Sequence, residues 1–207
     1  MKTEDFTTAL AKYEKVLGEI ERGAAKLHFE VRQTYGKNLP YSIHLCDVAS
    51  LVKHFAAPIV RDENDIVPLL FGAYYHDSIE DARVTYYDVL GIAKKYMNDE
   101  QALVAAEIVY ALTTEKGKTK QERTNDKYFM GIRTTPYAPL VKACDRLANM
   151  KYSAAHAKNE KKSAGMFSIY KKELPEFLSK ITTKRATEEL SVPKELLDAL
   201  EQFLVEK

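Results

Sequence analysis

Cysteine is scarce in this sequence. Cys46 and Cys144 are the only two thiols among 207 residues, and each lies in a segment with an apolar helical pattern. Small secreted proteins rely on a framework of several disulfides, which two cysteines do not provide. We therefore interpret both as reduced core residues and expect a cytoplasmic protein.

Long apolar runs are also missing. Every apolar stretch is shorter than the roughly 20 residues that a membrane-spanning helix requires. The N-terminal segment MKTEDFTTAL has no apolar core of the kind found in signal peptides. We expect neither a membrane segment nor a membrane partner.

Charge of one sign is not in excess. Lys and Arg total 31 and Asp and Glu total 30, so the formal net charge is +1. This balance produces no bulk attraction to nucleic acid, and we expect no DNA or RNA partner. A composition of 45% hydrophobic and 29% charged residues fits a globular protein. The oligomeric state stays open.

Strand signals are absent too, whereas helical periodicity runs through most of the chain. Apolar residues recur at spacings of three and four, as amphipathic helices require. Gly23 is expected to break or bend the first helix before a short second segment. Helices are predicted over approximately residues 6–20, 27–31, 41–56, 66–77, 84–97, 99–115, 137–153, 163–181 and 193–204.

Two polar stretches separate these helices. TYGKNLP, at 34–40, is predicted to be a loop, and the basic stretch 116–139 a longer one with room for a short helix. No linker divides the chain. We therefore predict an all-α protein with one domain over 1–207, a motif-bearing core at about 25–155, and C-terminal helices in 163–207 packed on it.

Asp145 is the first residue that suggests chemistry. It lies in the middle of an apolar helical segment and shares a face with Val141 and Asn149, four positions away on either side. A buried carboxylate is costly unless it is paired or coordinated. Asp145 therefore needs a cation, which is either a metal ion or a structural partner such as Lys142 or Arg146.

Three further residues favour the metal. His44 is followed 32 residues later by the adjacent pair His76 and Asp77, and Asp145 comes 68 residues after Asp77, on predicted helices or helix ends. This ordered pattern resembles the HD superfamily of metal-dependent phosphohydrolases. The resemblance implies a helical bundle in which His44, His76, Asp77 and Asp145 bind one metal ion. His28, His54 and His156 are weaker candidates.

Three sequence blocks narrow the resemblance. VRQTYGKNLPYSIHLCDVA, HDSIEDARVT and VKACDRLANM occur in order within about residues 25–155. They resemble blocks of the RelA/SpoT-type alarmone hydrolases, including their small single-domain relatives. This implies hydrolysis of guanosine 3′,5′-bis(pyrophosphate), the nucleotide of the stringent response, at its 3′-pyrophosphate. It also implies Mn²⁺ as the metal, and a set of imidazoles and carboxylates equally suits Fe, Zn or Co.

The same resemblance assigns roles around the metal. Glu80 and Asp81 match the acidic pair that positions or activates the attacking water. Arg32 and Asn149 match residues near the nucleotide, and Lys142 and Arg146 are further candidates for substrate binding. The simpler alternative for the acidic pair is a solvated helix end.

Departures from the family pattern keep other functions open. Ala148 stands where the alarmone hydrolases commonly have a histidine, which bears on the pocket wall. One alternative is therefore an HD phosphohydrolase for another nucleotide or small phosphoester, and another is a non-catalytic nucleotide-binding protein. Synthetase and regulatory domains have no counterpart, so we expect hydrolysis only. The basic loop 115–127 is expected to close over phosphates or to remain a solvated loop.

Overall fold

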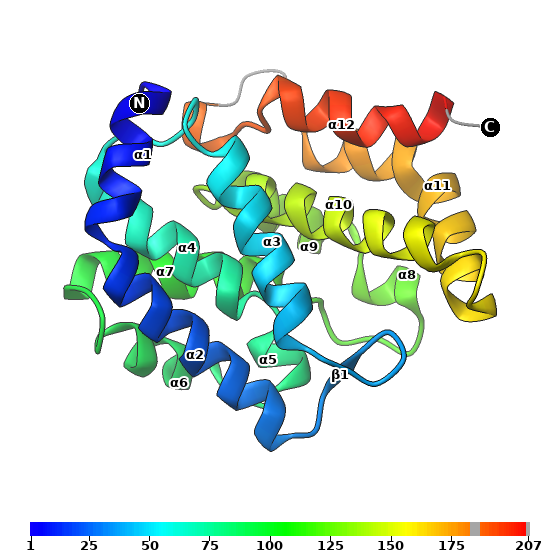
Figure 1. Ribbon diagram of the computed structural model, residues 1–207, viewed down its shortest axis with the longest axis horizontal. Helices are drawn as coiled ribbons and strands as arrows, with labels where there is room; N and C mark the ends of the chain where they lie inside the picture. Colours follow the sequence, from blue (N-terminus) through cyan, green and yellow to red (C-terminus); the bar gives the residue numbers. More distant parts are fainter. Residues whose placement is uncertain (183–186, 206–207) are drawn as a thin grey trace.

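The computed structural model describes residues 1–182 and 187–205, and helices dominate them (Figure 1). The predicted all-α class is confirmed. The α-helices are α1 (Thr3–Lys12), α2 (Glu14–Glu30), α3 (Ser42–Phe55), α4 (Ile66–Tyr75), α5 (Ser78–Asp81), α6 (Tyr86–Ala93), α7 (Asp99–Leu112), α8 (Lys120–Arg123), α9 (Asp126–Thr134), α10 (Ala138–His156), α11 (Lys161–Ile181) and α12 (Lys194–Val205). Short 3₁₀ turns occupy Glu63–Asp65 and Glu188–Leu190.

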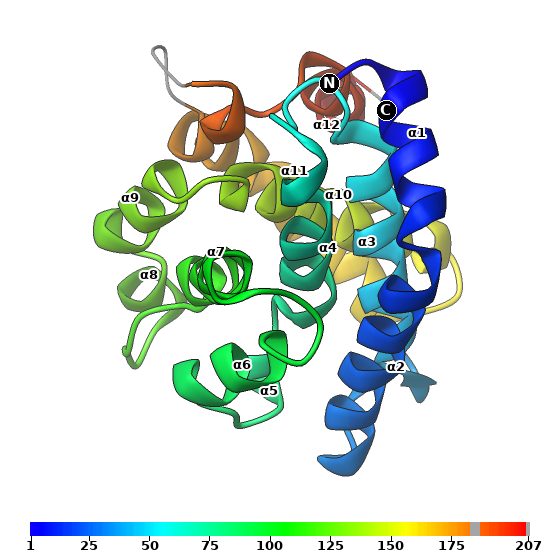
Figure 2. The same cartoon turned by 90° about the vertical axis from the view of Figure 1, so that its left-hand side faces the viewer.

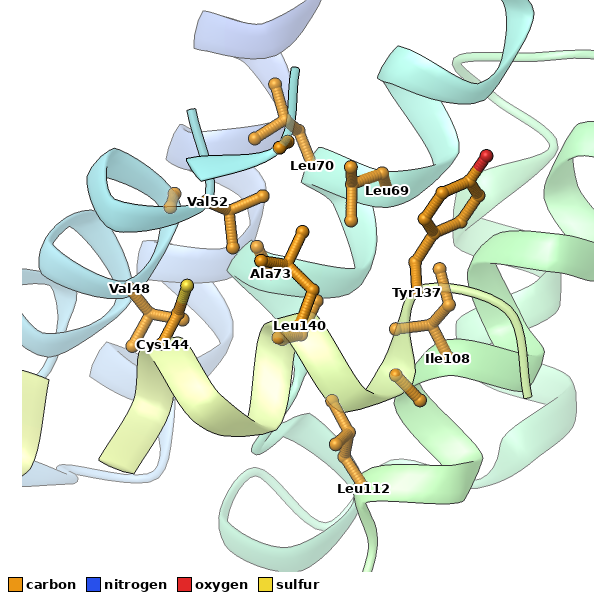
Figure 3. Packing of buried hydrophobic residues seen from close by; sticks show 14 of the residues in the cluster. Val48, Val52, Leu69, Leu70, Ala73, Ile108, Leu112, Tyr137, Leu140 and Cys144 are labelled. Atoms are coloured by element: carbon orange, nitrogen blue, oxygen red, sulfur yellow. The ribbon is translucent and has the colours of Figure 1, made fainter. Parts of the chain in front are cut away.

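Helix α4 forms the centre of the molecule. All ten of its residues are buried, as its continuous apolar sequence predicts. It packs against α2, α3 and α7, while α10 crosses α3 (Figure 2). Figure 3 shows the result, with side chains from α3, α4, α7 and α10 meeting in one cluster. Burial of this apolar surface is the main source of stability.

The first helical region breaks at a different place from the one predicted. The interruption lies at Tyr13, and α2 continues through Gly23 without a break. A Cβ atom at Gly23 would lie 2.5 Å from the hydroxyl of Tyr75 and 3.1 Å from that of Tyr96. The glycine is therefore required by the close approach of neighbouring side chains, and the helical hydrogen bonds on either side of it keep the helix intact.

The loop predicted at 34–40 is a small antiparallel hairpin. Strands β1 (Thr34–Tyr35) and β2 (Leu39–Pro40) pair with Thr34 opposite Pro40 and Tyr35 opposite Leu39. The prediction that strands are absent is therefore wrong at this point, because two-residue strands are too short to show alternation. The hairpin leads directly into α3 (Figure 1).

Several helix ends follow the sequence closely. Thr85 and Asp88 form a capping box at the start of α6. The basic stretch contains two helices, α8 and α9, instead of a single short one. Both expected C-terminal helices are present as α11 and α12, while residues 183–186 and 206–207 of the predicted 163–207 segment lie outside the described residues.

Among the described helices, none has the length and apolar character to cross a bilayer.

Candidate metal site and adjoining pocket

Three helical segments bring the predicted ligands together. His44 lies in the first turn of α3, Asp145 in the middle of α10, and His76 and Asp77 between the end of α4 and the single turn α5. The helix that was predicted to reach Asp77 ends at Tyr75. This ending turns the His76 and Asp77 side chains toward the other two residues.

Three of the four side chains converge on one point, and Asp77 lies against both imidazoles. One donor atom from each of His44, His76 and Asp145 lies within 4.8 Å of the other two. Oδ1 of Asp145 is 3.3 Å from Nε2 of His44 and 3.8 Å from Nε2 of His76. Oδ2 of Asp77 is 3.6 Å from Nε2 of His44 and 3.0 Å from Nε2 of His76. The carboxylates thus face both imidazoles.

The donor set fits a divalent transition metal. Nδ1 of His76 lies 2.9 Å from the carbonyl oxygen of Ala73, so in the neutral ring this nitrogen carries the proton and leaves the lone pair on Nε2. No hydrogen bond satisfies that Nε2 within the described part of the chain. This buried lone pair faces carboxylate oxygens, and no hydrogen-bond donor of the described residues lies between them. A cation bound at this point would satisfy both the nitrogen and the oxygens.

The ionisable side chains of the site strongly shift one another's pKa values. Burial alone would lower the pKa of His44, but the carboxylates of Asp145 and Asp77 raise it to about 9. Burial alone would raise the pKa of Asp77, and His76 and His44 hold it well below its usual range. The pKa of Asp145 is likewise lowered against the effect of burial, first by Lys142 and then by the imidazoles. Both carboxylates are therefore ionised at neutral pH and suited to bind a cation.

Three neighbours hold the carboxylates in place. Lys142 donates to Oδ2 of Asp145 at 2.9 Å, so the structural pairing considered from the sequence exists beside the candidate metal site. Asn149 donates from Nδ2 to Oδ1 of the same aspartate at 2.6 Å. Tyr41 donates to Oδ2 of Asp77 at 2.5 Å. Such contacts orient the carboxylates of metal sites.

A pocket of about 1070 Å³ adjoins the site. Its lining mixes acids, cations and aromatic rings, and Asp145 lies in its wall. The charged and aromatic residues that line it are Glu80, Asp81, Lys120, Arg123, Tyr128, Phe129, Lys142, Asp145, Arg146, Tyr170, Glu173, Glu176, Phe177 and Lys180. A cavity of this size accommodates a nucleotide-sized ligand.

Glu80 and Asp81 project from α5 into this pocket. Glu80 accepts a hydrogen bond from the backbone N–H of Thr114 at 2.5 Å. Asp81 accepts one from Nε2 of Gln33 at 3.0 Å. Burial, followed by the nearby charge of Asp77, raises the pKa of Asp81. Both acids therefore line the pocket, with Glu80 exposed to solvent and Asp81 partly buried.

Cations from three helices surround the same pocket. Lys120 of α8 and Arg146 of α10 both contact Glu173 of α11, Lys120 at 2.6 Å and Arg146 at 3.4 Å. The Arg146 guanidinium also lies 4.7 Å from the ring centre of Tyr170 and 4.5 Å from that of Phe177. From the basic stretch, Lys120 and Arg123 line the pocket, whereas Lys127 pairs with Glu115 at 3.0 Å.

The segment that leads into the hairpin places Arg32 away from the pocket and its neighbours close to the site. Arg32 is exposed, has a positive φ of 58°, and is not among the residues that line the pocket. Its neighbour Gln33 reaches Asp81, and Tyr35 stacks on His44 with ring centres 4.9 Å apart. Neither contact was predicted, and the only sequence signal was that both residues lie in the block VRQTYGKNLPYSIHLCDVA, ahead of His44.

Comparison with known proteins shows similarity to a curated hydrolase and to a solved structure. The guanosine-3′,5′-bis(diphosphate) 3′-pyrophosphohydrolase MESH1 from Danio rerio is 26% identical over 136 residues, covering 66% of this chain and 68% of that protein. The predicted resemblance is confirmed. A solved structure of a metazoan ortholog of SpoT, described as hydrolysing ppGpp with a role in starvation responses, superposes with a TM-score of 0.56. It shares 19% sequence identity, covers 90% of this chain and 94% of that one, and shows that the two have the same fold. No family model matches the chain.

Proposed function

We propose that this chain is a metal-dependent hydrolase that removes the 3′-pyrophosphate from guanosine 3′,5′-bis(pyrophosphate) and related alarmones. The observation that carries the proposal is the convergence of His44, His76, Asp77 and Asp145 beside a cation-lined pocket whose wall includes Asp145. The similarity to a curated 3′-pyrophosphohydrolase supports the choice of substrate.

The four residues would hold one divalent ion, which we propose to be Mn²⁺. Two imidazoles with two carboxylates suit Mn, Fe, Zn or Co better than Mg, which prefers an all-oxygen shell. When bound, the ion polarises a phosphoryl oxygen and lowers the pKa of bound water. The Asp77 and Asp145 carboxylates, kept ionised by their neighbours, supply the negative charge that retains it.

Glu80 is the proposed general base. The hydrogen bond from Thr114 anchors Oε1, and Oε2 receives no hydrogen bond from the residues that the structure describes. That second oxygen accepts a proton from water as the water oxygen bonds to the phosphorus attached to O3′. The bond from this phosphorus to O3′ breaks, O3′ takes up a proton, and pyrophosphate leaves. Asp81, held by Gln33, orients the water.

Cations and aromatic rings of the pocket suit the rest of the substrate. Lys142 lies beside Asp145, where it faces the pyrophosphate that leaves. Arg146, Lys120 and Arg123 line the part of the pocket nearer to α8 and α11 and offer positive charge to the 5′-pyrophosphate. Preorganised positive charge of this kind stabilises the charge that develops during phosphoryl transfer.

The test is hydrolysis of guanosine 3′,5′-bis(pyrophosphate) by the purified protein with Mn²⁺, with pyrophosphate and phosphate measured separately. We expect one pyrophosphate per turnover and almost no phosphate. A panel of 5′-monophosphates and 5′-triphosphates should be attacked little. Release of no pyrophosphate from the alarmone would show that the substrate assignment is wrong.

Substitution of Glu80 tests its proposed role as the general base. Glu80→Gln removes the proposed base but keeps the shape, and we expect turnover to fall at least 100-fold with Mn²⁺ affinity unchanged. The matched control is Glu100→Gln, an exposed acid in the first turn of α7. Equal turnover in both variants would exclude Glu80 as the base.

A second substrate class has support in two residues near the site. Ala148, which is buried next to the pocket-lining Asn149, stands where the related hydrolases commonly carry a histidine, and Glu173 adds a negative charge to the pocket. Both features favour a less highly charged phosphoester. The same nucleotide panel decides, since this alternative predicts faster release of phosphate from a monophosphate than of pyrophosphate from the alarmone.

We propose that the protein works in the cytoplasm and has no DNA or RNA partner. Both cysteines are free thiols, Cys144 buried and Cys46 partly buried, which agrees with a reducing compartment. The net charge of +1 supports the absence of a nucleic-acid partner. Localisation of a tagged protein in fractionated cells tests the compartment, and recovery in a secreted fraction would contradict it.

A further inference from the structure

The two imidazoles of the metal site are held in different ways. His76 is fixed by the hydrogen bond from Nδ1 to the carbonyl oxygen of Ala73. For Nδ1 of His44, no residue in the described ranges 1–182 and 187–205 supplies a partner. A ligating histidine normally uses this second nitrogen to orient its ring. His44 must therefore be oriented by packing.

Tyr35 provides that packing from the hairpin. Its ring lies 4.9 Å from the ring of His44 with an angle of 26° between the planes, which is a stacked arrangement. Tyr41 adds an edge contact to His44 at 5.5 Å. Tyr35 packs in turn against Tyr152 of α10, with ring centres 4.4 Å apart. The phenol is thus lodged between α3 and α10.

The Tyr35 hydroxyl makes a second connection to the site. It donates to Oδ1 of Asn149 at 3.2 Å. A donor at Oδ1 fixes which way the amide faces, and Nδ2 of Asn149 then donates to Oδ1 of Asp145 at 2.6 Å. Tyr35 therefore acts on His44 through its ring and on Asp145 through Asn149.

Gly36 allows the hairpin to lie close enough for these contacts. Its φ is +53°, and a Cβ atom there would lie 1.7 Å from the hydroxyl of Tyr152. Any side chain at this position would push the hairpin away from α10. The position of Tyr35 thus depends on the absence of a side chain at the next residue.

We infer that Tyr35 is a positioning residue for the metal site, which orients His44 by stacking and Asp145 by way of Asn149. The inference rests on the proposed metal site but is independent of the nucleotide that the protein hydrolyses. Residues that orient ligands in this way typically contribute about 10- to 100-fold to metal affinity.

Metal affinity is the measurement that tests this role. Mn²⁺ binding is measured by competition with a chelator for the wild type, Tyr35→Leu and Tyr35→Phe. We expect about 10- to 100-fold weaker binding for the leucine variant, which loses the ring and the hydroxyl. The phenylalanine variant keeps the stacking and should recover most of the affinity. Phe71→Leu and Tyr74→Phe, both in buried positions of α4, are the matched controls and should bind as the wild type does.

A spectroscopic readout separates positioning from loss of stability. The visible absorption of bound Co²⁺ reports the geometry of the ligands, so it should change in Tyr35→Leu and remain unchanged in the two controls even where thermal unfolding occurs earlier. Wild-type affinity together with a wild-type Co²⁺ spectrum in Tyr35→Leu would overturn the inference. A wild type that binds neither ion would overturn the metal site itself, and with it the proposed function.

A double-mutant cycle tests whether the Tyr35 hydroxyl acts on Asp145 through Asn149. It does not depend on the folding of Tyr35→Leu. Tyr35→Phe, Asn149→Ala and the double variant are compared for Mn²⁺ affinity. If the hydroxyl acts through Asn149, removing it has an effect in the wild-type background and none in Asn149→Ala. Equal effects in both backgrounds would contradict this route.

Discussion

Glu173 accepts hydrogen bonds from Nζ of Lys120 at 2.6 and 2.7 Å, and so joins α11 to α8 within the lining of the pocket. Because Arg146 contacts the same carboxylate, one acid neutralises two of the cations proposed to bind phosphate. A polyanionic substrate must compete with this resident anion.

Glu173→Gln should therefore strengthen substrate binding. Exposed ion pairs contribute about 0–1 kcal/mol, so we expect KM for the alarmone to fall by up to about 5-fold with kcat nearly unchanged. Steady-state kinetics at low and high salt measure the effect. Glu195→Gln, an exposed acid on α12, is the control. A higher KM in Glu173→Gln would mean that Glu173 organises the cations for substrate instead of competing with it.

Lys142 and Asp145 form a buried pair, with pKa values displaced in opposite directions. Burial alone would lower the pKa of Lys142, but Asp145 raises it well above its usual range. Lys142→Gln leaves the aspartate without its partner and should lower the unfolding free energy of the metal-free protein by about 3 kcal/mol. Saturating Mn²⁺ should reduce this difference, because the ion supplies the missing charge.

Denaturant unfolding with EDTA and with Mn²⁺ tests that expectation. Lys94→Gln removes an exposed pair with Asp99 and should cost less than about 1 kcal/mol in both conditions. If Lys142→Gln costs the same with and without the metal, Asp145 does not face the ion.

His28 should produce an acid-sensitive step in stability. Burial is the main reason that its pKa falls to about 4, against about 6.5 in the unfolded chain. The unfolded state therefore binds the additional proton first. Stability due to neutral His28 is complete above pH 6.5 and is lost as the pH falls toward 4, by at most about 3 kcal/mol.

His28→Phe isolates this step, since neither ring nitrogen of His28 has a hydrogen-bond partner within the described residues. In metal-free protein, the variant should gain about 2–3 kcal/mol relative to the wild type between pH 7.5 and pH 4.5. Urea unfolding at both values measures the change. An unchanged difference between the two proteins would show that His28 binds its proton as readily in the folded state as in the unfolded chain.

Gly72 lies where α4 meets α7. A Cβ atom there would lie 2.5 Å from Cγ2 of Ile108, whereas at Gly91 of α6 it would meet no atom within 4 Å. Gly72→Ala should therefore destabilise the fold by about 1–3 kcal/mol, and Gly91→Ala should stabilise it by about 0.5–1 kcal/mol. Thermal unfolding of the two variants measures both signs. Ile108→Ala removes Cγ2, the atom nearest to the added Cβ, so the double variant should lose less stability than the sum of the two single variants.

Local pattern predicted much of the fold because helix signals are short in range. The apolar residues of α4 and the capping residues Thr85 and Asp88 depend on neighbours within a few positions. The prediction of a helix break at Gly23 was wrong for the same reason. Its local preference indicates a break, but the residue that requires a glycine is Tyr75, 52 positions away in the sequence.

Sequence order by itself determined which residues gather at the candidate metal site, because the ligands come from helices whose patterns are clear and whose spacing resembles a known family. Tertiary structure alone decided what supports them. Tyr35 meets Asn149 across 114 positions, and Lys120 meets Glu173 across 53. No periodicity relates such residues, since their contacts arise only after the helices have packed and one short hairpin has fitted against α10.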